Sequence, residues 1–341
     1  MSSKGRSESP IRDTADIIAD LASRSKTPFS PLLMEPPYVG IPTFFHLPHQ
    51  EDPAGLDIAL VGVPYDGGLT GRTGTRGGPR AVRDQSFLTG AYEHQTQIIP
   101  AMICRCADIG DVIIHNRFHH DEAIRELEAY YSGLVDAGVV PVTCGGDHSI
   151  SFPILKALGA KEPVGLIHFD SHCDTDGANH GSRFHHGAPF RRAVETGVLD
   201  PLRTIQIGIR GKTELLWHFS YESGMRVIHI EEFYEMGWKK VVEEARRIIG
   251  QKPVYLSFDI DCLDPAFAPG TGTPEIGGIT SFEAQQVIRG LRGLNFIGGD
   301  LVEVSPPFDS ANITALAGAN LLFQIFCVVA DATAKRKEGQ P

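Results

Sequence analysis

Seven short runs of apolar and β-branched residues recur along the chain, and they constrain its fold more than any other feature. The runs lie at residues 58–63, 139–143, 164–169, 204–209, 226–230, 254–260 and 296–304. Because these runs lack polar alternation, we expect strands that are buried on both faces of a parallel sheet. Segments of helical length separate several of them, at residues 121–136, 233–249 and 281–291. The sequence therefore predicts an α/β fold of three layers with a mainly parallel central sheet.

The N-terminal part of the chain differs from the rest. Residues 1–30 are polar, with an early Pro10 and only a weak amphipathic patch at residues 17–21. We expect residues 1–45 to form an N-terminal extension that is partly disordered or contacts another subunit. No repeat or low-complexity linker divides the remainder, so residues 46–341 are expected to form one domain with a sizeable core.

The charge balance disfavours two classes of partner. The 341 residues include 31 Lys and Arg against 42 Asp and Glu, which gives a formal net charge of −11. This balance argues against binding to nucleic acid or to an anionic membrane surface. Residues 321–330 form the most apolar stretch, but it is short and bounded by Asn320 and Asp331. We therefore expect a buried helix there, and no membrane span.

Cysteine usage and the first residues suggest a compartment. The six cysteines include no CxxC pair and lack the density of a disulfide-rich secreted scaffold. The first residues, MSSKGRSESPIRD, hold no apolar run of the kind found in a secretory signal. We therefore expect a cytoplasmic protein.

Unusual polar residues follow three of the predicted strands. The first of these strands leads into CGGDHS at residues 144–149, the second into HFDSHCD at 168–174, and the third ends in FDID at 258–261. Ligands of open parallel sheets bind outside the carboxyl ends of the strands. All three segments are therefore expected at one edge of the sheet.

Carboxylates converge at this predicted edge. In an extended chain Asp170, His172 and Asp174 point the same way, as do Asp259 and Asp261. A single Asp after a strand is more often a helix cap than a ligand, but converging carboxylates repel each other unless cations neutralise them. Mixed carboxylate and imidazole groups suit manganese, nickel, cobalt or zinc better than calcium or copper(I). Two such ions that share ligands activate water, which predicts hydrolysis of a poor electrophile.

These segments resemble the ureohydrolase family, which includes arginase, agmatinase, guanidinobutyrase and guanidinopropionase. The resemblance rests on GGDHSI at residues 145–150, HFDSHCDT at 168–175, SFDIDCLDPAFAPGTGTPEIGG at 257–278, HHGAPFRRA at 185–193 and DLVEVSPPFD at 300–309. Within the family, these sequence motifs are most similar to those of guanidinopropionase and guanidinobutyrase. The resemblance implies an arginase-like fold, a homo-oligomer that is a trimer or a hexamer, and hydrolysis of a small guanidino substrate to urea and an amine. Residues 46–341 would then be the catalytic domain.

The resemblance also implies a ligand set. It implies two divalent ions per subunit, with Mn²⁺ as the first expectation and Ni²⁺ as the alternative. One ion would be bound by His148, Asp170, Asp174 and Asp259, and the other by Asp170, His172, Asp259 and Asp261. Asp170 and Asp259 would bridge the ions, and Asp174 would also accept a hydrogen bond from the nucleophile.

Two further residues resemble catalytic groups of the family. Glu303 resembles the carboxylate that binds the guanidinium, because a carboxylate matches a planar fork of N–H donors. His186 resembles the histidine that transfers a proton to the departing nitrogen. Glu303 could instead be an ion-paired strand end and His186 a loop residue, and the adjacent His185 competes for the role. We prefer His186 because a Gly follows it, as in the family's HG pair.

The substrate is the least constrained part of the prediction. Ser171, Cys173 and Ala188 depart from the agmatinase pattern, and Asn179, His180 and Arg183 follow the metal motif where relatives bind the distal end of the substrate. These three residues suit a carboxylate, so we expect a short ω-guanidino acid such as 3-guanidinopropionate or 4-guanidinobutyrate. In the Gly-rich segment 65–80, Arg72 or Arg76 could also meet that carboxylate.

Three alternatives stay open. The first is a substituted guanidine or biguanide of the metformin type, hydrolysed with nickel, and the second is agmatine. The third belongs to another class, a non-catalytic partner subunit in a heteromer with an active paralogue. The complete set of predicted ligands, together with Glu303 and His186, argues against the partner subunit.

Overall fold

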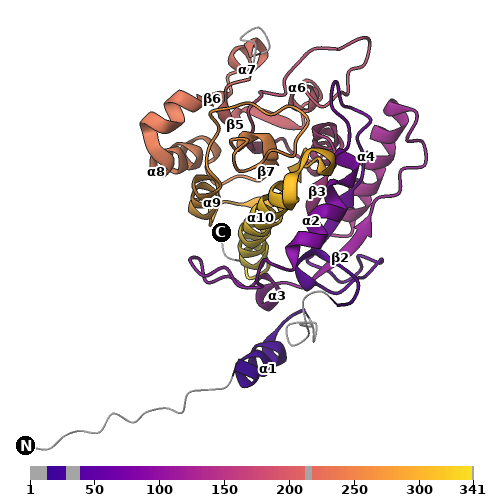
Figure 1. The fold of residues 1–341 in the computed structure, drawn as a ribbon, viewed down its shortest axis with the longest axis vertical. Helices are drawn as coiled ribbons and strands as arrows, with labels where there is room; N and C mark the ends of the chain where they lie inside the picture. Colours follow the sequence, from indigo (N-terminus) through magenta and orange to yellow (C-terminus); the bar gives the residue numbers. More distant parts are fainter. Residues whose placement is uncertain (1–13, 28–38, 212–216, 340–341) are drawn as a thin grey trace, which may run out of the picture.

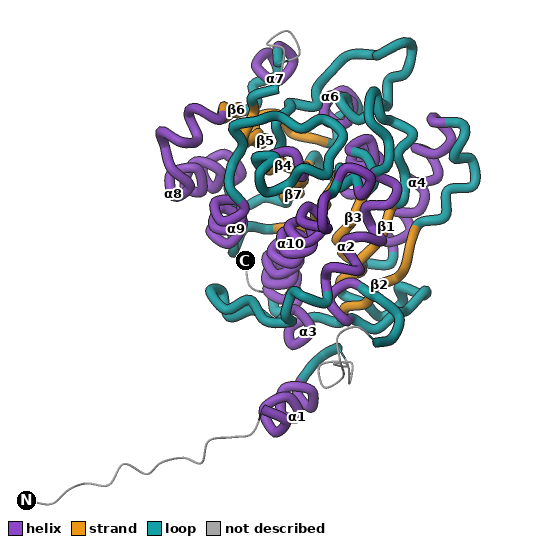
Figure 2. Tube along the Cα trace, in the orientation of Figure 1, coloured by secondary structure: helices purple, strands orange, loops and turns teal. Residues whose placement is uncertain are grey.

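An eight-stranded parallel sheet forms the centre of the molecule (Figures 1 and 2). The computed structural model describes residues 14–27, 39–211 and 217–339. The strand order is β2-β1-β3-β8-β7-β4-β5-β6, and every pair of neighbours is parallel. The strands are β1 (Ile58–Val63), β2 (Cys106–Asp111), β3 (Val140–Gly145), β4 (Val164–Phe169), β5 (Leu199–Ile209), β6 (Arg226–His229), β7 (Val254–Asp259) and β8 (Phe296–Val302). The predicted α/β class and parallel sheet are confirmed.

Helices cover both faces of this sheet. The α-helices of the described residues are α1 (Thr14–Arg24), which lies apart from the sheet (Figure 1), α2 (Gly78–Ser86), α3 (Pro100–Ile103), α4 (His120–Asp136), α5 (Ser151–Leu158), α6 (Pro189–Glu195), α7 (His218–Glu222), α8 (Ile230–Ile249), α9 (Ser281–Gly290) and α10 (Ile313–Lys337). One core cluster joins the sheet to α2, α8, α9 and α10, and a second joins it to α4, α5 and α6. Along β1, Ile58 and Leu60 enter the first cluster, whereas Ala59 and Val61 enter the second. This division explains why the strands read as continuous apolar runs.

All seven predicted runs contain strands, but the sequence did not reveal β2. Its sequence, CADIGD, carries two aspartates, and it lies at the edge of the sheet, where β1 is its one neighbouring strand among the described residues. Three predicted runs also end earlier in the structure, at residues 229, 259 and 302. The run at residues 296–304 ends early because the chain leaves β8 at Val302, where Glu303 adopts φ 65°.

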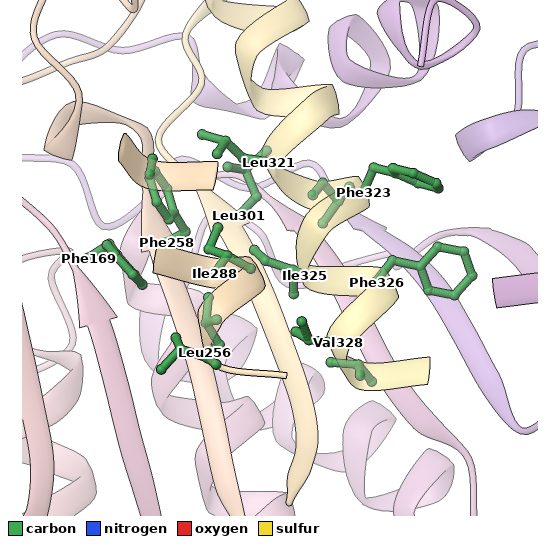
Figure 3. Packing of buried hydrophobic residues seen from close by; sticks show 14 of the residues in the cluster. Phe169, Leu256, Phe258, Ile288, Leu301, Leu321, Phe323, Ile325, Phe326 and Val328 are labelled. Atoms are coloured by element: carbon green, nitrogen blue, oxygen red, sulfur yellow. The ribbon is translucent and has the colours of Figure 1, made fainter. Parts of the chain in front are cut away.

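Helix α10 is the apolar C-terminal helix that the sequence predicts. Its segment Ser310–Lys337 is long and apolar enough to cross a membrane, yet 78% of its most apolar window is buried in this fold. Figure 3 shows Leu321 and Ile325 directed toward the side chains of β7 and β8. The helix also packs along α2 and α9. The prediction of a buried helix is confirmed.

The predicted N-terminal extension contains structured and core-forming residues. Helix α1 lies apart from the main body (Figure 1), while Thr27 donates a hydrogen bond to the carbonyl of Cys104. Phe44 and Phe45 are buried in the main core cluster, although the sequence-based boundary places both in the extension. Residues 1–13 and 28–38 of that extension lie outside the described residues.

Candidate metal centre and active site

The three predicted segments meet at the carboxyl edge of the sheet. His148 begins the 3₁₀ helix that follows β3, Asp170 directly follows β4, and Asp259 ends β7. The order β3-β8-β7-β4 places these strands beside one another although they are far apart in the sequence. The rule that locates ligands at this edge therefore holds here.

The six predicted metal ligands lie in two overlapping groups. The ligand atoms of each group lie within 4.8 Å of one another. The first group is His148, Asp170, Asp174 and Asp259, and the second is Asp170, His172 and Asp261. Asp170 belongs to both, as the predicted bridge requires, whereas Asp259 belongs only to the first. The Oδ1 atom of Asp259 accepts a hydrogen bond from the backbone N–H of Asp261 at 2.8 Å.

All four residues of the first group are buried. The Nδ1 atom of His148 lies 2.9 Å from Asp174, 3.2 Å from Asp170 and 3.3 Å from Asp259. This nitrogen has no hydrogen-bond partner among the described residues. A buried imidazole nitrogen that faces three carboxylate oxygens without bonding to them fits a site for a divalent cation.

The charges of the cluster lead to the same conclusion. Burial and the charges of Asp261 and Asp170 raise the pKa of Asp259 well above its usual range. Among the ion pairs of the described residues, these carboxylates are paired only with histidines. The cluster therefore has an excess of negative charge that cations would neutralise.

A third histidine, which the sequence analysis did not single out, supports the shared aspartate. The Nε2 atom of His168 lies 2.8 Å from Oδ2 of Asp170, and its Nδ1 lies 3.1 Å from the amide nitrogen of Gln206. All three side chains are buried. The signal was present in the sequence, because His168 precedes Asp170 by two residues.

Two of the predicted residues have a backbone conformation that L-residues rarely adopt. Asp174 has φ 50° and Glu303 has φ 65°. Such left-handed conformations are uncommon outside Gly and Asn, and they concentrate at functional sites. At Glu303 this conformation accompanies a change of direction at the end of β8. Its Oε1 accepts a hydrogen bond of 2.9 Å from the backbone N–H of His148.

His186 lies between Glu303 and the Gly-rich loop. Its Nδ1 lies 3.2 Å from Oε1 of Glu303, and its Nε2 lies 2.8 Å from the hydroxyl of Thr70. Burial disfavours the charged imidazole, but the hydrogen bond and charge of Glu303 raise the pKa of His186 to about 9. The competing His185 contacts the carbonyl of Gly177 at 2.8 Å and does not line the cavity described next.

A cavity of about 240 Å³ opens onto the cluster. His172, Asp174, Asp259 and His186 line it, so the candidate ligands and the candidate proton donor share one space. Its wall also includes residues that the sequence analysis did not assign, namely Thr70, Cys173, Asp176, Trp217, Thr273 and Glu275. These come from loops whose course no local pattern reveals. Burial and the charge of Asp174 raise the pKa of Asp176 to about 7.

The residues expected to bind the far end of the substrate lie elsewhere. Asn179 forms an isolated bridge with Ser182, His180 is exposed, and Arg183 pairs with Glu195 at 3.2 Å. None of the three expected residues lines the described cavity. Arg72 stacks over the ring of Phe308 and Arg76 pairs with Asp66. The described wall of the cavity therefore contains no Lys or Arg.

Comparison with known proteins identifies the family. The sequence profile of the arginase family matches residues 56–327. A guanidinopropionase of Pseudomonas aeruginosa is 50% identical over 88% of this chain and 95% of its own length, and a guanidinobutyrase of the same species is 47% identical over 86% and 94%. The structure of proclavaminate amidinohydrolase from Streptomyces clavuligerus superposes with a TM-score of 0.84 and 38% identity, covering 87% of this chain and all of that one. This chain belongs to the arginase family.

Proposed function

We propose that this chain is a binuclear-metal amidinohydrolase, which uses water to split a guanidino C–N bond into urea and an amine. The observation that carries the proposal is the orphaned Nδ1 of His148 among three carboxylates. Two of these, Asp174 and Asp259, line a cavity that His186 also lines. The arginase family depends on two metal ions. The six residues His148, Asp170, His172, Asp174, Asp259 and Asp261 would hold them.

We assign each candidate catalytic residue one role in this reaction. Bound divalent ions would lower the pKa of a water molecule and so supply a nucleophile at neutral pH. Asp174 lines the cavity and can accept the remaining hydrogen bond of that nucleophile, which fixes its orientation. Glu303 has a second carboxylate oxygen, Oε2, with no hydrogen-bond partner among the described residues, so it can accept a guanidinium N–H. His186, with a raised pKa, holds a proton that the departing amine needs.

A short ω-guanidino acid is the first candidate substrate. The two relatives described above act on guanidino compounds of this kind by name, and they align over nearly their whole length. A cavity of about 240 Å³ suits a short substrate. We therefore propose 3-guanidinopropionate or 4-guanidinobutyrate.

The described wall of the cavity favours a second candidate. It contains Asp176 and Glu275 beyond the candidate ligands, together with the ring of Trp217, and among the described residues it contains no Lys or Arg. Acidic and aromatic groups suit a cationic or neutral tail better than a carboxylate. A substituted guanidine or biguanide is therefore the second candidate, and agmatine, with its cationic tail, is the third.

The metal, the assembly and the compartment belong to the proposal as well. We propose Mn²⁺, with Ni²⁺ as the alternative, because carboxylate and imidazole ligands accept both. We also propose a cytoplasmic homo-oligomer. Mass measurement in solution tests the assembly, and a monomer would contradict it.

One panel of assays tests the reaction and ranks the substrates. The chain is reconstituted separately with manganese and with nickel, and urea and amine release are measured for guanidinopropionate, guanidinobutyrate, agmatine, arginine, guanidine and metformin. We expect turnover of a short guanidino acid and about two metal ions per chain. Two bound ions without turnover of any of these compounds would favour the partner-subunit alternative.

A further inference from the structure

A buried chain of hydrogen bonds lies behind His148, on the side away from the carboxylates. The Nε2 atom of His148 lies 2.8 Å from the hydroxyl of Ser257, and that hydroxyl lies 2.6 Å from Oδ1 of Asp300. All three side chains are fully buried. Neither Ser257 nor Asp300 belongs to the groups of candidate ligands. Their presence in the core therefore needs a separate explanation.

The sheet places these groups side by side. Ser257 in β7 pairs directly with Asp300 in β8, so their side chains rise from the same face. Tyr255 precedes Ser257 by two residues and shares this face. A Cβ at Gly298 would approach the ring of Tyr255 to 3.1 Å, so glycine leaves room for the ring.

Asp300 is an acceptor for three hydroxyl groups. Its Oδ2 lies 2.6 Å from the hydroxyl of Ser151 and 2.8 Å from that of Tyr255, while its Oδ1 accepts the hydrogen bond from the hydroxyl of Ser257. Burial raises the pKa of Tyr255 well above its usual value, so its phenol is a donor. Three O–H donors thus satisfy both oxygens of this buried side chain.

The direction of these hydrogen bonds determines where the proton of His148 lies. A serine hydroxyl has one proton, and Ser257 donates it to Asp300. The hydroxyl oxygen can then only accept from Nε2 of His148, so Nε2 carries a proton. The other nitrogen, Nδ1, is left with its lone pair directed at Asp170, Asp174 and Asp259. A lone pair at this position is what a metal ion requires of its imidazole ligand.

We propose that Asp300 is a positioning residue of the metal centre, which acts through Ser257 to hold His148 in the tautomer that presents Nδ1 to the ion. This inference rests on the proposed metal site. It assigns a function to a buried carboxylate that touches neither the ions nor the substrate. Phe190, whose ring centre lies 5.1 Å from that of His148, packs against the imidazole and limits its rotation.

The substitution Asp300→Asn tests the proposal. Its amide group can donate to Ser257, whose proton would then turn toward Nε2 of His148 and leave a proton on Nδ1. We expect the affinity for Mn²⁺ to fall about 10- to 100-fold, as it does when an outer partner of a ligand is lost. Affinity is measured by titration of the metal-free protein against a competing chelator, so the readout does not depend on turnover.

Tyr255→Phe is the matched control. It removes one of the three donors to Asp300 but leaves Ser257 and His148 as they are, so we expect the Mn²⁺ affinity to change less than about twofold. A folded Asp300→Asn protein with wild-type affinity would overturn the proposal. An equal loss of Mn²⁺ affinity in Tyr255→Phe would also overturn it, because the hydrogen-bond network would then have only a structural role.

A second pair decides the matter if Asp300→Asn does not fold. Ser257→Ala removes the bridge and should lower the Mn²⁺ affinity by up to about tenfold, whereas Ser151→Ala should not. Equal affinities in this pair would overturn the proposal. Wild-type protein that binds no divalent ion would instead contradict the proposed function, so the two failures are distinguishable.

Discussion

Buried acids at the two edges of the sheet are neutralised in different ways. At the amino edge, Asp57 precedes β1 and forms ion pairs with Arg105, at 2.8 Å, and with Lys337. Burial opposes its charge, but hydrogen bonds from Arg105 and Lys337 lower the pKa of Asp57 to about 2. At the carboxyl edge, Asp259 is buried among other acids, and its pKa is raised well above the usual range.

The two sites differ in the groups that neutralise the buried acids. For Asp57 the chain supplies Arg105 and Lys337 as partners. The acids of the candidate metal cluster form ion pairs only with imidazoles among the described residues, and one of these, His148, presents an unbonded nitrogen to the acids. Acids without fixed cations are costly to bury unless ions from solution join them. The comparison therefore predicts that changes at the two edges differ in their dependence on metal.

The largest effect is expected from Asp170→Asn at the carboxyl edge. Asp170 belongs to both ligand groups, so we expect loss of both ions and of all measurable turnover. Elemental analysis after dialysis, together with urea release, measures this. The control is Asp331→Asn. Asp331 lies in α10 and is paired with Arg292 and Lys335, so this variant should retain both ions. Full metal content in Asp170→Asn would contradict the expected difference in metal dependence between the two edges.

His186→Ala is expected to separate catalysis from metal binding. The imidazole contacts Glu303 and Thr70 but is not among the ligand groups. Loss of a general acid slows a reaction by about 10²- to 10⁴-fold, so we expect a decrease in kcat with two ions still bound. Steady-state rates and metal content of the same preparation test this. Equal kcat in the variant and the wild type would show that another group supplies the proton.

The sequence revealed the candidate ligands because they depend on local rules. Asp170 follows β4 and Asp259 ends β7, and parallel strands bring their carboxyl ends to one edge. These rules need no knowledge of the strand order. The predicted extended alternation beyond them is wrong, because Asp174 has φ 50° and Asp261 lies in the 3₁₀ helix Ile260–Cys262. His186 and Glu303 were instead indicated by the resemblance to the family, and the structure brings them within 3.2 Å of each other.

The wall of the cavity could not be predicted in the same way. Thr70 and Trp217 reach it from loops, whose paths depend on packing against distant elements. Arg183 appeared suitable for a substrate carboxylate, but Glu195, twelve residues later, pairs with it. The left-handed backbone of Asp174 and Glu303 also has no signature in the sequence, because neither residue is Gly or Asn.

Removal of metal should destabilise the wild-type protein. A ligand that binds only the folded state stabilises it by about 4 kcal/mol per site at 1,000 times its dissociation constant. We therefore expect a chelator to lower the Tm of the wild type and to leave that of Asp170→Asn unchanged. Thermal unfolding of both proteins with and without chelator measures the effect. A wild-type Tm that does not respond to the chelator would contradict the difference between the two edges.

The smallest effect is expected from Asp57→Asn at the amino edge, which should lower the stability of the fold whether or not metal is bound. A folded pKa of about 2, below the ordinary 3.8, means that ionised Asp57 stabilises the fold above pH 3.8 and that this contribution is lost as the pH falls toward 2. Arg105 and Lys337 are half exposed, so we expect a loss of about 1 kcal/mol at neutral pH. Urea unfolding of both proteins across this pH range measures the difference in stability. That difference should shrink with acid and be the same with or without chelator, and a chelator-dependent difference would show that the two edges are coupled.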